Sequence, residues 1–87
     1  MFISYDSQAD AVYIQFDSTA ALSTDTREID MWRYVDYDET GEVIGVEFLR
    51  VSHGIDLTGI PEAEQVAAAI RSLPGVAEKL RRTPPAA

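Results

Sequence analysis

Residues 28–51 of this chain, EIDMWRYVDYDETGEVIGVEFLRV, carry its strongest structural signal. β-Branched and aromatic residues, which favour extended strands, lie on both sides of the polar segment 38–41. That segment begins with Asp and ends with Gly, as turns between strands commonly do. We therefore predict a β-hairpin with strands over residues 28–37 and 42–51.

A helical interpretation of residues 28–37 also has some support. Three large apolar residues, Ile29, Trp32 and Val35, recur there at near-helical spacing. The dense aromatic and β-branched content of the segment nevertheless favours a strand.

Residues 36–47 also approximate an EF-hand calcium loop. Acids stand at loop positions 1 and 3, Gly at position 6 and Glu at position 12. Thr and Ile, however, occupy the ligand positions 5 and 9, and the Val- and Gly-containing segment that follows is poor helix material. We favour the hairpin and keep a divalent-cation site as the alternative. Its candidate ligands are Asp36, Asp38 and Glu47.

The rest of the chain adds a second hairpin and a helix. Residues 2–5 and 11–16 are strand-like and are separated by a polar turn, whereas residues 17–26 are small and polar and predict a loop. Pro61 suits a first helical turn, and the apolar residues that follow recur at helical spacing. These recurring residues are Val66, Ile70 and Leu73.

The predicted fold class is α+β, a four-stranded antiparallel β-meander with a C-terminal helix packed on one face. We predict a single domain over residues 1–82. It comprises the meander over 1–53, the helix over 61–73 and a short helical turn over 76–82. Residues 83–87 are predicted to form a disordered tail.

Composition limits the classes of function. The 87 residues carry a net charge of −8 and include no cysteine, which excludes disulfides, thiolate metal sites and a cysteine nucleophile. Residues 1–60 hold twelve acidic and three basic residues, and such a surface repels nucleic acid. A basic protein partner or a cation fits it better. We find no secretory signal and no membrane-spanning run, so we expect a cytoplasmic protein that does not bind membranes.

The strands over residues 11–16 and 42–51 are apolar on both faces. One short helix can cover only one face of the sheet, so we expect a partner on the other. A homo-oligomer, most simply a dimer, is the first expectation, and a small basic protein is the second. The predicted interaction face consists of Trp32, Tyr34 and Tyr13.

Residue types suited to catalysis occur without a convincing arrangement. Three aspartates flank the strand over residues 11–16, where carboxylates usually form turns. The residue types of a hydrolase triad fall within five positions of each other, although a triad needs groups that converge from separate elements. We therefore assign no catalytic residue, and we expect neither an enzyme nor a cofactor. The residues considered are Asp6, Asp10, Asp17, Ser52, His53 and Asp56.

Two blocks of residues together resemble a known family. The first comprises Tyr5-Asp6, Ala9-Asp10-Ala11 and Tyr13-Ile14, and the second comprises Val35-Asp36-Tyr37-Asp38, Gly41, Val43-Ile44-Gly45 and Glu47. Over about residues 1–53 the chain resembles the small prokaryotic family catalogued as domain of unknown function 2283. The resemblance implies a compact β-rich unit and supports the hairpin over the calcium loop. It supplies no established activity, although members are sometimes proposed to act as antitoxin-like partners of small toxins.

The sequence thus predicts a small protein-interaction module that self-associates or binds a small basic protein. The alternative is a divalent-cation-binding protein or metal-dependent enzyme that uses the acidic cluster of Asp36, Asp38 and Glu47.

Overall fold

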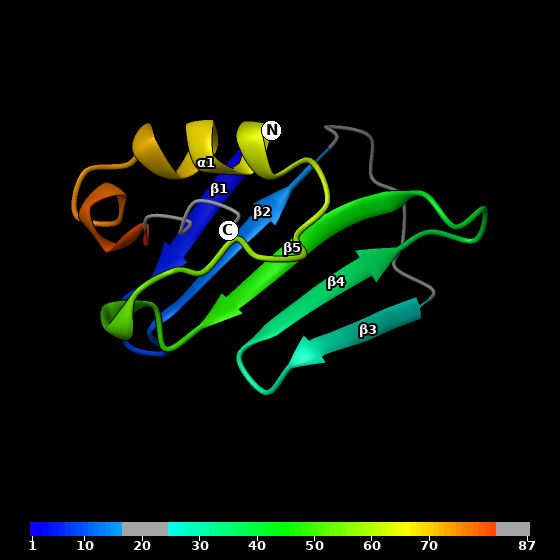
Figure 1. Ribbon diagram of the computed structural model, residues 1–87, viewed down its shortest axis with the longest axis horizontal. Coiled ribbons are helices and arrows are strands. Elements are labelled where there is room, and N and C mark those ends of the chain that lie inside the picture. Colours follow the sequence, from blue (N-terminus) through cyan, green and yellow to red (C-terminus); the bar gives the residue numbers. More distant parts are fainter. Residues whose placement is uncertain (17–24, 82–87) are drawn as a thin grey trace, which may run out of the picture.

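The computed structural model describes residues 1–16 and 25–81 (Figure 1). Within them, five antiparallel strands form one sheet, and an α-helix and two short 3₁₀ turns accompany it. The strands are β1 (Phe2–Asp6), β2 (Ala11–Gln15), β3 (Asp25–Asp30), β4 (Arg33–Tyr37) and β5 (Val43–Leu49). The helical elements are η1 (Val51–His53), α1 (Ala63–Arg71) and η2 (Ala77–Lys79).

The strand order across the sheet is β1-β2-β5-β4-β3. The hairpins β1–β2, β3–β4 and β4–β5 each join neighbours in sequence, whereas β5 also pairs with β2. This long-range pairing inserts β5 between β2 and β4, so the sheet is not the simple meander that we predicted.

The hydrophobic core lies between one face of the sheet and α1 (Figure 1). The register places Val12 opposite Phe48 and Ile14 opposite Val46, and all four side chains are fully buried. Burial of each such side chain contributes roughly 1.5–3 kcal/mol to folding. The remaining core residues are Val35, Val51, Ile55, Leu57, Ile60, Val66, Ala67, Ile70 and Val76.

The segment after the sheet folds back over this core. Its return is fixed by two backbone hydrogen bonds, from Ile55 N to Lys79 O (2.7 Å) and from Arg81 N to Ile55 O (2.9 Å). The helix α1 contributes Val66 and Ile70, which lie at helical spacing and are fully buried. None of the described helices is both long and apolar enough to cross a membrane.

The number of strands corrects our prediction of four. The segment 28–37, predicted as one strand, turns back at Met31–Trp32 and forms parts of β3 and β4. The Asp30 carboxylate closes the turn by accepting hydrogen bonds from the Trp32 backbone N–H (2.9 Å) and from the Arg33 guanidinium (2.8 and 3.0 Å). Consequently Met31 is 61% exposed and does not join Val35 in the core.

Arg33 is the one polar or charged residue that is buried among those the structure describes. Besides its ion pair with Asp30, its Nη1 donates to the backbone carbonyls of Asp56 (3.1 Å) and Thr58. A buried guanidinium is tolerated only when its N–H groups are paired. Arg33 therefore ties the β3–β4 hairpin to the segment that precedes α1.

Candidate interaction surface

The sheet face opposite the core is the candidate site, and we call it the open face. In the described part of the chain, α1 and the core lie on the other side of the sheet. Directly paired residues of an antiparallel sheet share a face, so the register identifies the members of the open face. They are Phe2, Ser4, Asp6, Ala11, Tyr13, Gln15, Thr26, Glu28, Tyr34, Asp36, Gly45, Glu47 and Leu49.

One row of residues crosses the whole open face. Ser4 pairs with Tyr13, Tyr13 with Glu47, Glu47 with Tyr34, and Tyr34 with Glu28. Two tyrosines thus flank a glutamate at the centre of the sheet, and all three side chains are half-buried. A tyrosine presents an apolar ring and a polar hydroxyl, which suits it to binding surfaces.

The Tyr13 ring lies across the neighbouring row, above Gly45. Its hydroxyl donates a hydrogen bond to Asp36 Oδ2 (2.9 Å), and the Thr26 hydroxyl donates to Asp36 Oδ1 (2.5 Å). A Cβ at Gly45 would overlap the Tyr13 ring and hydroxyl. Glycine in a strand interior marks such a close approach, and here it leaves the space that the Tyr13 ring and hydroxyl occupy.

The environment of Tyr13 changes its acidity. Burial is the largest cause, followed by the hydrogen bond to Asp36 and the negative charges of Asp36 and Glu47, and together they raise the pKa of Tyr13 to about 12. The phenol therefore stays neutral at physiological pH and keeps its proton in the bond to Asp36.

The charge of the open face has one sign. Its strand residues include four carboxylates and no lysine or arginine among those that the register places there. The carboxylates are Asp6, Glu28, Asp36 and Glu47. At its β1 edge the face also carries Phe2, which is 59% exposed. This surface combines aromatic area with a negative field, which is complementary to a basic partner.

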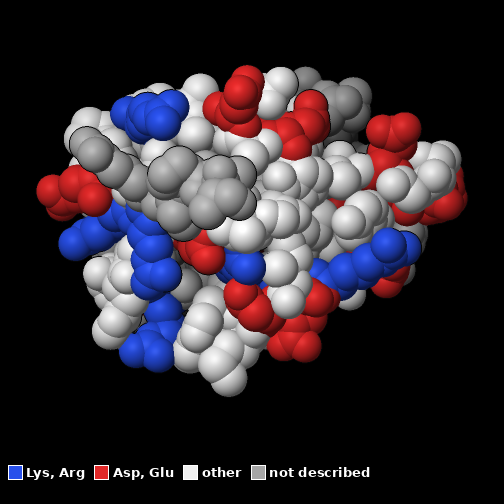
Figure 2. Space-filling model, viewed as in Figure 1, with Lys and Arg blue, Asp and Glu red and all other residues white. Residues whose placement is uncertain are grey.

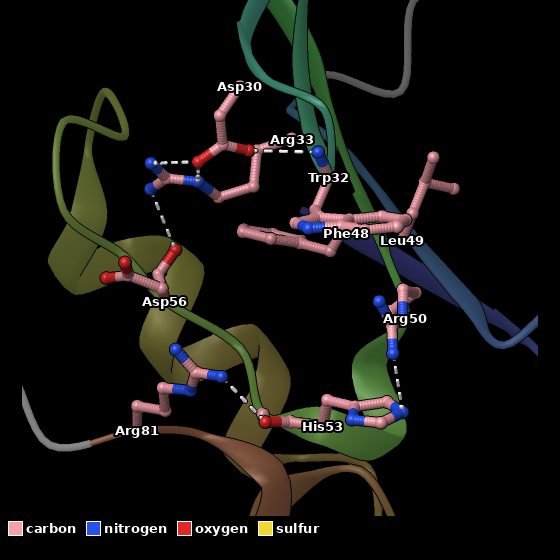
Figure 3. Close-up of a pocket in the computed structure, with 10 residues that line it drawn as sticks. Asp30, Trp32, Arg33, Phe48, Leu49, Arg50, His53, Asp56 and Arg81 are labelled. Atoms are coloured by element: carbon pink, nitrogen blue, oxygen red, sulfur yellow. Dashed lines mark hydrogen bonds and ion pairs between the residues drawn. The ribbon is translucent and has the colours of Figure 1, made fainter.

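The three residues of the predicted interaction face do not form one patch. Tyr13 and Tyr34 share the open face, on either side of Glu47. Trp32 lies in the β3–β4 turn, where the Arg50 guanidinium stacks over its ring at 4.6 Å. Trp32 faces a cavity at the end of the sheet (Figure 3).

The three candidate cation ligands have separate roles. Asp36 accepts two hydroxyl hydrogen bonds on the open face, and Glu47 stands between the tyrosines. Asp38 Oδ1 accepts from Thr40 N (2.8 Å), Thr40 Oγ1 (2.7 Å) and Glu42 N (3.0 Å), which closes the β4–β5 turn. Across residues 1–16 and 25–81, no three His, Asp or Glu side chains are grouped to hold a metal ion.

Residues 36–47 form a hairpin, which corrects the EF-hand alternative because strands flank the turn where that motif requires helices. The Asp38 carboxylate is held ionised by its hydrogen bonds. The Thr40 hydroxyl and then the backbone N–H groups of the turn lower its pKa.

The three residues of the hydrolase-triad types each bond to a different partner. Ser52 donates from its hydroxyl (2.6 Å) and its backbone N–H (2.9 Å) to Asp10, which joins η1 to the β1–β2 turn. His53 Nε2 pairs with Arg50 (3.2 Å), and Asp56 accepts from Thr58 N (2.9 Å). A nucleophile bonded to a histidine, as acyl transfer requires, is therefore not formed by these residues.

The turn interpretation of the other aspartates is partly tested. Asp6 Oδ1 accepts from the backbone N–H groups of Gln8 (3.0 Å) and Ala9 (3.1 Å), as a turn-forming carboxylate does. Asp17 lies outside the described residues.

Sequence reasoning missed three residues, two that shape the open face and one that fixes the β3–β4 turn. Gly45 enters the sequence analysis as poor helix material and as part of a family block, yet glycine inside a strand pattern also indicates a close approach. Thr26 falls in the predicted loop over residues 17–26, and Arg33 is not among the predicted site residues. No local signal links Arg33 to its carbonyl partners, which lie more than twenty residues away in sequence.

The fold and surface define a class: a small α+β protein whose antiparallel sheet is covered by a helix on one side and carries a tyrosine- and carboxylate-bearing face on the other. The model of the family described as "Protein of unknown function (DUF2283)" matches residues 3–52. The chain belongs to this family, as the two sequence blocks indicated. The match spans the sheet and ends within η1, so α1 and η2 lie beyond it. The searches of curated proteins and of solved structures returned no match.

Proposed function

We propose that this protein is an interaction module that binds a basic segment of a partner protein on the open face of its sheet. The observation that carries the proposal is the row in which Tyr13 and Tyr34 flank Glu47, on a face whose strand residues include carboxylates and no lysine or arginine. Arginine or lysine side chains can pair with the carboxylates and stack on the tyrosine rings.

A second copy of the chain is a less favourable partner for this face. Two open faces brought together would set carboxylates against carboxylates, and buried like charges are costly. The net charge of −8 adds a long-range repulsion between copies and an attraction for a basic protein. The face therefore favours heterologous binding over the homodimer that the apolar strands alone would suggest.

Association with a labelled arginine-rich peptide tests the proposal by fluorescence anisotropy. Glu47→Gln removes a central charge and keeps the shape, so we expect roughly fivefold weaker binding, equivalent to about 1 kcal/mol. Glu64→Gln is the matched control, because Glu64 is an exposed residue of α1 on the other side of the sheet. Both variants lose one negative charge, so only a local effect separates them.

Equal weakening by the two substitutions would show that the peptide responds to net charge alone and would overturn the proposal. Added salt provides a second criterion, because binding that depends on these carboxylates must weaken as salt increases. A molar mass measured by light scattering that equals two chains would support the homodimer instead.

A further inference from the structure

A cavity of about 270 Å³ opens at the end of the sheet, away from the tyrosine row. It is enclosed by the β3–β4 turn, the end of β5, η1 and the C-terminal segment (Figure 3). Its walls include three of the seven Lys and Arg residues of this acidic chain and its single histidine. Figure 2 shows basic side chains gathered at this end of the molecule, which also carries η1 and η2 in Figure 1.

The cavity wall holds two carboxylates and three guanidiniums. Asp30 is paired with the buried Arg33 through Nε (3.0 Å) and Nη2 (2.8 Å). Asp56 accepts a hydrogen bond from the Thr58 backbone N–H (2.9 Å), which lowers its pKa, with Arg33 and Arg81 as weaker causes. The Asp56 carboxylate points away from the hollow in Figure 3. Three guanidiniums against two carboxylates leave the wall with a net charge of +1.

Arg33 is paired with Asp30, whereas Arg50 and Arg81 lie beside His53 and approach it from two sides (Figure 3). Arg50 Nη2 lies 3.2 Å from His53 Nε2, and Arg81 Nη2 donates to the His53 carbonyl oxygen at 2.7 Å. Each guanidinium carries five N–H donors, so donors beyond these contacts are available to a ligand.

The backbone is shaped to hold these two guanidiniums. Arg50 adopts a left-handed conformation with φ 51°, which is unfavourable for a residue with a side chain. Gly54 has φ 111°, and a Cβ there would overlap the Arg81 side chain. The strained backbone of Arg50 and the missing side chain of Gly54 thus each place a guanidinium beside the cavity, that of Arg50 and that of Arg81.

The rest of the wall is apolar and aromatic. Trp32, Phe48 and Leu49 line it, and Trp32 is 39% exposed, which is high for the only tryptophan of the chain. Small-molecule sites commonly combine such an apolar wall with a few convergent polar groups. The volume corresponds to about nine water molecules at about 30 Å³ each, which suits a ligand of roughly ten non-hydrogen atoms.

We propose that this cavity binds a small organic anion, with its carboxylate or phosphate held between Arg50 and Arg81 and its apolar body against Trp32. Guanidinium groups form paired hydrogen bonds with either kind of oxyanion. The site is separate from the tyrosine row, so it gives the module a second, independent binding function. It also places the ligand beside the β3–β4 turn, which Asp30 and Arg33 hold together.

Trp32 makes the site directly observable, because fluorescence excited selectively at tryptophan reports on this cavity alone. Phenyl phosphate and benzoate are the probes, and phenol is the neutral control of similar size. We expect saturable changes in emission with one or both anions and none with phenol. Comparison of the two anions shows whether the site prefers phosphate or carboxylate.

Substitutions then locate the anion. Arg50→Gln and Arg81→Gln each remove charged hydrogen bonds, so each should weaken binding by about tenfold or more. Arg71→Gln is the matched control, because Arg71 is an exposed residue of α1 and does not line this cavity. Calorimetry gives the same affinities without the fluorescence of Trp32, and thermal unfolding confirms that each variant is folded.

The proposal is overturned if neither anion produces a saturable change at millimolar concentration, or if phenol binds as well as the anions. It is also overturned if folded Arg50→Gln and Arg81→Gln bind as the Arg71→Gln control does. None of these results depends on whether a basic partner binds the open face.

Discussion

Gly45→Ala is the most informative single substitution, because it adds one methyl group where the Tyr13 ring lies on the sheet. The new Cβ would overlap the ring and its hydroxyl, so the ring must move away. The ring then loses its packing and its 2.9 Å hydrogen bond to Asp36. Overpacking costs about 1–3 kcal/mol, and a hydrogen bond to a charged group contributes about 1.5–3 kcal/mol.

These effects overlap, since one movement of the ring causes both, and a half-exposed hydrogen bond contributes less than a buried one. We therefore expect a loss of about 2 kcal/mol in the free energy of unfolding. For a chain of this size, that loss lowers Tm by roughly 10 °C. Urea unfolding followed by circular dichroism measures it, provided that the slope with denaturant is unchanged.

A double-mutant cycle separates this overlap from any general cost of alanine in β5. In a Tyr13→Ala background no ring opposes the new methyl group, and Gly45→Ala should be neutral or stabilise by up to about 1 kcal/mol. If Gly45→Ala lowers stability equally in both backgrounds, overlap with the Tyr13 ring is not the cause of the loss.

Three further predictions concern single side chains. The Tyr13 pKa of about 12 lies above its usual 10.0, so the stability that the neutral phenol provides is complete below pH 10 and is lost as pH rises through 12. Ultraviolet titration should show one tyrosine that ionises at higher pH than the others, and Tyr13→Phe should remove that late transition. The Asp38 pKa is lowered, so the contribution of its carboxylate to the free energy of unfolding is present above pH 3.8 and is lost as the solution is acidified below that value. Asp38→Asn should therefore reduce the dependence of stability on pH in this acidic range, as measured by urea unfolding. Arg33→Met removes the donor to the carbonyls of Asp56 and Thr58 and the ion-pair partner of Asp30 Oδ2. Calorimetry should therefore show a loss of about 2–4 kcal/mol, with Arg33→Lys intermediate.

The β4–β5 hairpin was predictable because its information is local. Strand-forming residues flank a polar turn, and the Asp38 side chain that closes the turn lies within it. The N-terminal hairpin was predictable for the same reason, through the turn that Asp6 stabilises. The helix α1 lies within the predicted range of 61–73, where apolar residues follow helical spacing.

The β3–β4 turn has one local signal, Asp30, whose carboxylate accepts from the Trp32 backbone N–H. Met31 and Trp32 are not typical turn formers, and the alternation of apolar residues continues across them. The turn is held by Asp30 and by Arg33, whose other partners are carbonyls of the segment before α1. Asp30 closes the turn locally, and the bonds from Arg33 to distant carbonyls fix its position against the rest of the fold.

In the candidate sites, too, residue types could be predicted from the sequence, whereas their arrangement depends on contacts between distant segments. Tyr13 and Tyr34 were identified as interaction residues from their type, but their arrangement around Glu47 requires β5 to lie between β2 and β4. Trp32 was grouped with them because it lies two residues from Tyr34, and the turn separates the two. The cavity beside Trp32 needs η1 and Arg81 as well, so it had no local signal at all.

An amide-shift map shows directly whether the open face is the binding surface. A ¹⁵N-labelled sample is titrated with the arginine-rich peptide, and the backbone shifts of Tyr13, Tyr34 and Glu47 are compared with those of α1. We expect saturable shifts centred on this row and on Gly45 and Asp36, with little change in α1. Shifts centred on α1, or spread evenly over the acidic surface, would contradict it.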